Sequence, residues 1–186
     1  SGNGIPEVVL SLFEDSAGRI WVGSIRGEAG YVDQTTGKFT SIPIYDMNGK
    51  KVVRIYSYTE DNNGNIWIAT MGFGLFRHNV ATGQTTQWNH GRKQSIYYID
   101  AIYFSQQSGA LYLGTYDGLD IIADPTKNEV KNFEEKSIVF SIREDKAGNI
   151  WFATSEGLKM LDPLTEQTVT YTIDNGLPVN TVYSLE

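Results

Sequence analysis

One short phrase recurs along this chain, and its recurrence constrains the fold more than any other feature of the sequence. The phrase is a polar turn that runs into a tryptophan-centred apolar segment, EDNNGNIWIAT at residues 60–70. Near copies read EDSAGRIWVGS at 14–24 and EDKAGNIWFAT at 144–154, and a fainter copy reads SQQSGALYLGT at 105–115. The turn glycines of the four copies recur at intervals of about 39 to 46 residues. A period of this length fits one small four-stranded sheet, repeated.

Each copy reads as four strands joined by tight turns. The glycine of the phrase suits a turn that needs a positive φ, and the Asp that precedes it in three copies can bond forward to free backbone amides. A second turn, opened by Asp or Asn, closes the third strand, and its last position suits Gly37, Gly83 and Asn128 better than Glu166. The first strands are predicted at 8–13, 55–59, 99–104 and 138–143, and the second turns at 33–37, 79–83, 124–128 and 162–166.

The strand pattern predicts an all-β fold, because no long window has helical periodicity and nineteen glycines punctuate the chain. Four similar sheets predict a β-propeller with four blade-like antiparallel repeats, part of a larger propeller. Trp21, Trp67 and Trp151 are then expected in the core between blades. Uncovered blade faces would favour self-association or packing against further blades of a parent protein. The predicted repeats are 5–45, 52–90, 97–134 and 137–174, and residues 179–186 are predicted as the first strand of a following repeat.

Composition excludes several classes of function. The 186 residues carry a net charge of -7, and the fifteen basic residues are scattered, so a nucleic-acid partner is not expected. Cysteine is absent, which removes disulfides and thiolate metal sites. No stretch reaches the roughly 18 apolar residues of a membrane-spanning helix, and the first residues do not resemble a signal peptide. Any targeting or anchoring segment is therefore expected outside this sequence, and no cofactor or membrane contact is predicted within it.

The phrase at 60–70, the segment GLFRHNVATG at 74–83 and the linker DNGLPVNTVYSL at 174–185 together resemble the two-component regulator propeller repeat. The resemblance spans the whole chain and is weakest around 99–133. It implies a non-enzymatic sensor region in the periplasm, in the ectodomain of a hybrid two-component histidine kinase of the Bacteroidetes type. In that family the propellers help to recognise carbohydrate fragments and to signal across a dimer. The resemblance therefore implies an oligosaccharide ligand and a kinase elsewhere in the parent protein.

The candidate binding residues lie in the segments that differ between copies. The crossovers to the next repeat vary in length, and in a propeller they share one face with the turns between second and third strands. A sugar site needs planar aromatic rings, Arg or carboxylate groups, and partial dehydration. The candidates on that face are Arg26, Glu28, Phe73, Arg92, Tyr116, Asp117 and Glu156.

Two other functions remain open at this level. A propeller lyase resembling the streptogramin B lyases would need a His base near a carboxylate-bound cation. His78 is expected to be structural and partly exposed, which leaves His90 as the candidate base, without paired carboxylates nearby in the sequence. The segment 61–65 lacks the alternating oxygen ligands of a calcium loop, so no metal is predicted. The third possibility is an interaction scaffold that senses nothing itself.

Overall fold

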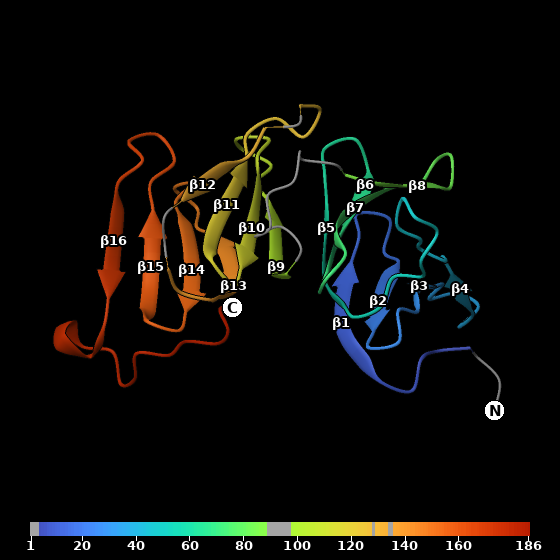
Figure 1. The fold of residues 1–186 in the computed structure, drawn as a ribbon, viewed down its shortest axis with the longest axis horizontal. Coiled ribbons are helices and arrows are strands. Elements are labelled where there is room, and N and C mark those ends of the chain that lie inside the picture. The colour runs from blue at the N-terminus through green and yellow to red at the C-terminus, as the bar shows by residue number, and fades with distance from the viewer. Residues whose placement is uncertain (1–3, 89–97, 128, 134–135) are drawn as a thin grey trace. The chain divides into compact units, whose positions relative to one another are not determined.

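A computed structural model describes residues 4–88, 98–127, 129–133 and 136–186. These residues form sixteen strands and one short 3₁₀ helix, Ile173–Asn175 (Figure 1). The prediction of an all-β chain is confirmed. The strands are β1 (Val9–Glu14), β2 (Ile20–Ser24), β3 (Ala29–Val32), β4 (Phe39–Ser41), β5 (Ile55–Glu60), β6 (Asn65–Thr70), β7 (Gly74–Asn79), β8 (Gln84–Gln87), β9 (Ile99–Phe104), β10 (Leu111–Thr115), β11 (Gly118–Ile122), β12 (Lys131–Phe133), β13 (Val139–Glu144), β14 (Ile150–Thr154), β15 (Gly157–Leu161) and β16 (Thr168–Tyr171).

The strands form four antiparallel sheets of four strands each, and every sheet follows chain order. The four predicted repeats therefore each correspond to one sheet, β1–β4, β5–β8, β9–β12 and β13–β16. The chain divides into two compact units, Ser1–Ile99 and Asp100–Glu186. Each unit holds two sheets, and the two units are described separately.

In unit 1 the second sheet packs on the first through its first strand, β5, which lies against β1 and β2. A Cβ atom on Gly23 would lie 2.7 Å from the Ile55 Cγ2 atom and 2.9 Å from the Ile55 carbonyl oxygen. Tyr58 of the second sheet donates a hydrogen bond from its hydroxyl to the Val22 carbonyl oxygen of the first sheet at 2.9 Å. The two sheets can therefore pack this closely only because residue 23 is a glycine, which has no Cβ atom.

Unit 2 repeats this packing with β13 against β10. A Cβ atom on Gly114, the counterpart of Gly23, would lie 2.8 Å from both the Val139 Cγ1 atom and the Val139 carbonyl oxygen. The core around this contact contains Tyr112, Phe152 and Leu161. A glycine at the fourth position of the phrase's strand thus allows the next sheet to pack closely in both units.

The Asp and Trp of the phrase form one hydrogen-bonded group. In the repeat of β13–β16, Asp145 accepts bonds from the amides of Ala147 and Asn149, and its other oxygen accepts the Trp151 indole N–H at 2.8 Å. The same indole bonds join Trp67 to Asp61 at 2.9 Å and Trp21 to Asp15 at 2.7 Å. The forward bonds of Asp were predicted from the sequence, whereas the indole bond was not.

The third repeat lacks both partners and replaces them together. Ser105 stands in the Asp position, accepts the Ser108 amide at 3.1 Å and donates its hydroxyl hydrogen to Glu144 at 2.7 Å. Tyr112 stands in the Trp position and is buried. The fainter copy of the phrase therefore keeps the turn and the buried ring without the indole–carboxylate bond.

Two details differ from the expectations. Trp21 and Trp67 are fully buried, but Trp151 is only half-buried and stacks on Tyr171 with ring centroids 5.6 Å apart. Residues 179–186 form no strand; they meet the fourth sheet through single bonds, such as that from the Val182 amide to the Thr154 carbonyl oxygen, rather than through a ladder. Whether this segment belongs to a following repeat stays a prediction.

The turn at 162–166 forms as predicted despite Glu166. The Glu166 amide donates to the Asp162 carbonyl oxygen at 2.8 Å, as the Gly37 amide does to the Asp33 carbonyl oxygen. In this turn Glu166 has a left-handed φ of 58°. This conformation is about 1–2 kcal/mol less favourable for an L-residue than a right-handed one. The end of the corresponding turn in the third repeat, Asn128, lies outside the described residues.

Candidate functional site

The crossover between the two sheets of unit 1 folds into a small hairpin, 44–52, that the sequence analysis missed. Asp46 accepts bonds from the amides of Asn48 and Lys50 through its side chain, and Tyr45 pairs with Lys51. The missed signal was the segment DMNGK at 46–50, which has the same Asp and Gly spacing as the turn of the recurring phrase. The hairpin carries polar and aromatic side chains on the predicted face, and Tyr45 is 55% exposed.

The hairpin approaches two of the predicted site residues, Arg26 and Glu28, in the turn between β2 and β3. The Ser24 hydroxyl donates a hydrogen bond to the Glu28 carboxylate. This bond, with the positive charges of Lys51 and Arg26, lowers the pKa of Glu28 despite some desolvation. Glu28 is therefore ionised at neutral pH and lies within electrostatic reach of two cations.

The same hairpin approaches Phe73 in the turn between β6 and β7. The Lys50 ammonium nitrogen lies 5.1 Å from the centroid of the Phe73 ring. Gln87 ties the turn to the hairpin, since its amide donates to the Phe73 carbonyl oxygen at 2.8 Å and accepts the Met47 amide at 3.0 Å. Phe73 itself is only 9% exposed and belongs to the core of unit 1. Its ring therefore packs beneath Lys50 and is not accessible for stacking against a ligand.

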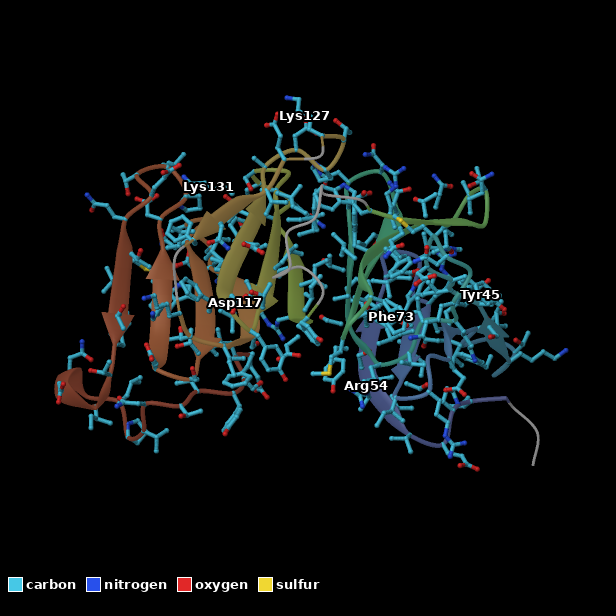
Figure 2. All side chains as sticks on the ribbon, in the orientation of Figure 1. Tyr45, Arg54, Phe73, Asp117, Lys127 and Lys131 are labelled. Atoms are coloured by element: carbon cyan, nitrogen blue, oxygen red, sulfur yellow. The ribbon has the colours of Figure 1, made fainter. Side chains whose placement is uncertain are left out.

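Arg54 ends the crossover and holds the two middle turns together. Its amide donates to the Ile25 carbonyl oxygen, and its carbonyl oxygen accepts the Met71 amide at 3.0 Å. Arg54 has a left-handed φ of 57°, which only firm local contacts can maintain in a residue with a side chain. We name the group Arg26, Glu28, Tyr45, Lys50, Lys51 and Phe73 the crossover surface; Figure 2 labels Tyr45, Arg54 and Phe73.

In unit 2 the predicted residues occupy equivalent turns, Tyr116 and Asp117 between β10 and β11 and Glu156 between β14 and β15. The amides of Asp117 and Glu156 each donate to the hydroxyl of a buried threonine, Thr115 and Thr154 respectively. Tyr116 is 43% exposed. The threonine hydroxyls therefore stabilise both turns. Asp117 lies at the opposite end of the strands from Lys127 (Figure 2).

His78, the one histidine among the described residues, has a structural environment. His78 is buried rather than partly exposed; its Nδ1 atom lies 2.8 Å from the Thr85 hydroxyl, and its ring packs against Trp21. Burial, and then the charge of Arg19, lowers the pKa of His78, which is therefore neutral at pH 7. His90 and Arg92 lie outside the described residues. Within the described part of the chain, no three His, Asp or Glu side chains gather into a group that could hold a metal ion.

Two adjoining hollows in unit 2 were not predicted. Each encloses about 220 Å³, and both are lined by Ser108 and Pro163. They lie at the hairpin turns, at the end of the strands away from Asp117. Gln107 and Asn149 are among the residues that line the first, and the second lies between the third and fourth sheets; the exposed lining of both is mostly apolar. No sequence signal marks them, because each depends on side-chain volumes from two sheets.

Comparisons with known proteins address the fold and the repeat. The sequence model of the two component regulator propeller family matches residues 3–26, 49–72 and 133–156, which is less than half of the chain. A search of curated proteins found no match. None of the described helices is long and apolar enough to cross a membrane.

Solved structures with the same fold include two extracellular domains from B. thetaiotaomicron. One, BT4673, is assigned to a one component system and has a TM-score of 0.71 at 22% identity over 88% of this chain. The other, BT3049, is assigned to a hybrid two component system and has a TM-score of 0.61 at 23% identity over 97%. This chain spans only 24% and 31% of those two chains.

A catalytically inactive virginiamycin B lyase from Staphylococcus aureus, solved with quinupristin, is similar at a TM-score of 0.72 and 17% identity; the match covers 88% of this chain and 55% of the lyase. Such identities show a shared fold alone. The fold belongs to the all-β propeller class, as predicted, and the matches fall on the phrase or its flanks in the first, second and fourth sheets. Three segments of the chain, one in each of these sheets, therefore match the repeat of the two component regulator propeller family.

Proposed function

We propose that this chain is a non-enzymatic, ligand-recognising part of an extracytoplasmic sensor in a two component signalling protein. The observation that carries the proposal is the match of three segments to the two component regulator propeller repeat. The similarity to extracellular domains of one component and hybrid two component systems supports a location outside the cytoplasm. We infer the periplasm as that compartment, and a histidine kinase as the output of the parent protein.

We further propose that the ligand is a carbohydrate fragment and that the crossover surface contributes to its site. Ionised Glu28 can accept hydrogen bonds from sugar hydroxyls, and Lys50, Lys51 and Arg26 can donate them. Tyr45 is exposed on the same hairpin and offers a ring for the flat C–H face of a sugar. The hairpin also joins two neighbouring sheets, so a ligand bound there could influence how they pack.

The lyase remains the second candidate because a lyase shares the fold. The buried, neutral state of His78 leaves His90, which lies outside the described residues, as the candidate base. We expect no turnover of a streptogramin B such as quinupristin by this chain. Turnover that disappears in His90→Ala would replace the sensor proposal with an enzyme.

Calorimetry and a glycan array test the carbohydrate proposal directly. We expect the chain to bind at least one oligosaccharide, and Glu28→Gln combined with Lys51→Met to weaken that binding roughly 10- to 100-fold, as the loss of charge-assisted hydrogen bonds predicts. Lys38→Met is the matched control, because Lys38 is exposed in a hairpin turn of the same sheet that takes no part in the crossover surface. Silence toward every oligosaccharide offered would favour the interaction scaffold instead.

A further inference from the structure

The apolar hollow of unit 2, which we name the inter-blade cavity, lies between the third and fourth sheets. Its wall includes Ala110, Tyr112, Ile121 and Leu161, and its volume is about 220 Å³. Tyr112, Leu161 and Ala110 are buried in the core of unit 2. Lys131 and Glu166, which are exposed, complete the lining, so the cavity is a partly open hollow between the two sheets.

The corresponding positions in unit 1 carry a cluster of ring side chains. The strand register pairs Trp21 with Tyr31 just as it pairs Tyr112 with Ile121, so these positions are equivalent. In unit 1 the rings of Tyr31 and His78 lie 5.3 and 5.6 Å from Trp21, and the Arg19 guanidinium lies 5.3 Å from the Tyr31 ring.

Three of these four side chains have smaller counterparts in unit 2: Tyr112 stands for Trp21, Ile121 for Tyr31 and Ala110 for Arg19. Leu161 stands for His78 and is of similar size. The cavity thus coincides with a loss of side-chain volume at three neighbouring positions. Its volume is sufficient for a ring, since engineered apolar cavities of about 150 Å³ already accept benzene.

The open end carries one ion pair that links the two sheets. The Lys131 ammonium on β12 lies 2.5 Å from a carboxylate oxygen of Glu166, which belongs to the turn after β15. The Lys131 ammonium also lies 5.6 Å from the centroid of the Phe133 ring, which lines the cavity; Lys131 is labelled in Figure 2. Glu166 is 61% exposed on its turn, and its backbone holds the left-handed φ of 58°.

The two charges are therefore not equivalent. Exposed ion pairs contribute little, so Glu166 can rotate into solvent at small cost. Lys131 would remain at the cavity mouth, where an anionic group of a ligand could replace the Glu166 carboxylate. A ligand that fits both features has a compact apolar body and a single negative charge.

We propose that the inter-blade cavity of unit 2 is a binding site for a small single-ring organic carboxylate, with the ring against Tyr112 and Leu161 and the carboxylate on Lys131. This site is separate from the crossover surface and does not depend on a carbohydrate ligand. Its wall is too apolar to satisfy the hydroxyls of a sugar.

Benzoate is the probe, and NMR titration of the ¹⁵N-labelled chain reads its position. We expect shifts at the amides of β10, β11 and β15 that saturate in the millimolar range, with benzyl alcohol, a neutral molecule of similar size, binding at least tenfold more weakly. Lys131→Met should weaken benzoate at least tenfold. Glu166→Gln should tighten it severalfold, because it removes the competing charge while retaining the size of the side chain.

Tyr112→Trp and Ala110→Leu fill the cavity from two sides, and either should abolish benzoate binding. The amide spectrum of each variant shows whether it is folded, so a binding loss in one folded variant suffices. Benzoate binding that survives cavity filling or Lys131→Met would overturn the proposal, as would equal affinity for benzyl alcohol or an absence of shifts in the wild-type chain.

Discussion

At the scale of single residues, the recurring phrase encodes one hydrogen-bonding device. The Asp carboxylate accepts two turn amides and one indole N–H, so the turn and the buried ring are fixed to one another. A buried indole needs an acceptor, and the Asp at the turn provides it. This explains why Asp and Trp occur together in the first, second and fourth repeats and are absent together from the third.

The Asp–Trp hydrogen bond predicts that the stability of unit 2 depends on pH. The Trp151 indole bond, followed by the Asn149 bond, lowers the pKa of Asp145 from 3.8 to about 2. Since the folded pKa lies below the unfolded one, the stabilisation is complete above pH 3.8 and is lost as pH falls toward 2. Asp145→Asn should therefore be less stable than the wild-type chain at pH 6 and approach it at pH 2. Urea unfolding across this range measures the difference, and a gap that is independent of pH would refute the assignment.

Burial predicts that the equivalent tryptophans are not energetically equal. Trp67→Ala should cost about 3–5 kcal/mol of unfolding free energy, because Trp67 is fully buried. Trp151→Ala should cost clearly less, because Trp151 is half-buried and has lost less contact with water. Hydrogen exchange read by mass spectrometry reports each unit separately. Equal losses of protection would contradict the difference in burial.

At the scale of elements, the packing of one sheet on the next within each unit depends on a single glycine of the phrase, Gly23 in unit 1 and Gly114 in unit 2. The position is occupied by Gly23, Ala69, Gly114 and Ala153 in the four repeats. In unit 1 the approach of Ile55 leaves no room for a methyl group on Gly23. The phrase therefore specifies both a strand and the place where its neighbour contacts it.

Gly23→Ala should destabilise unit 1 by about 1–3 kcal/mol, the usual cost of overpacking, because the new methyl group would meet Ile55 and the Ser11 hydroxyl. Ala153→Gly is the matched change in the opposite direction and should cost less than about 1 kcal/mol, through backbone entropy. Thermal unfolding compares the two. A Gly23→Ala variant as stable as the wild-type chain would show that the sheets can separate freely.

Sequence periodicity was sufficient to predict where the strands lie, but it was not sufficient to predict the candidate sites. The predicted first strands lie within about two residues of β1, β5, β9 and β13, because turn chemistry and alternating apolar residues act locally. The Asp-x-x-Gly turn in the sequence is sufficient to predict the hairpin at 44–52, although the analysis of crossover lengths did not include it. The left-handed Arg54 and the inter-blade cavity were not readable, because both depend on side chains and backbone brought together from two sheets.

At the scale of the whole molecule, the repeats differ in which faces are covered. Tyr58 and Ile142 occupy equivalent positions in the first strands of the second and fourth sheets and are 5% and 1% exposed. Leu12 holds the same position in the first sheet and is 68% exposed, beside the exposed Val9 and Leu10. The first sheet thus presents to solvent an apolar face that its counterparts bury.

Such a face favours association, either with another copy of the chain or with further blades. We expect the wild-type chain to self-associate as its concentration rises in sedimentation velocity experiments, and Leu12→Lys to shift it toward the monomer. Leu164→Lys makes the same chemical change at a residue that is 95% exposed on a hairpin turn of unit 2, and should leave association unchanged. Because Leu12 already faces water, its replacement should cost little stability, so a lost oligomer in a folded Leu12→Lys variant reports the face itself. A chain that stays monomeric at every concentration would show that this apolar strand alone does not drive self-association.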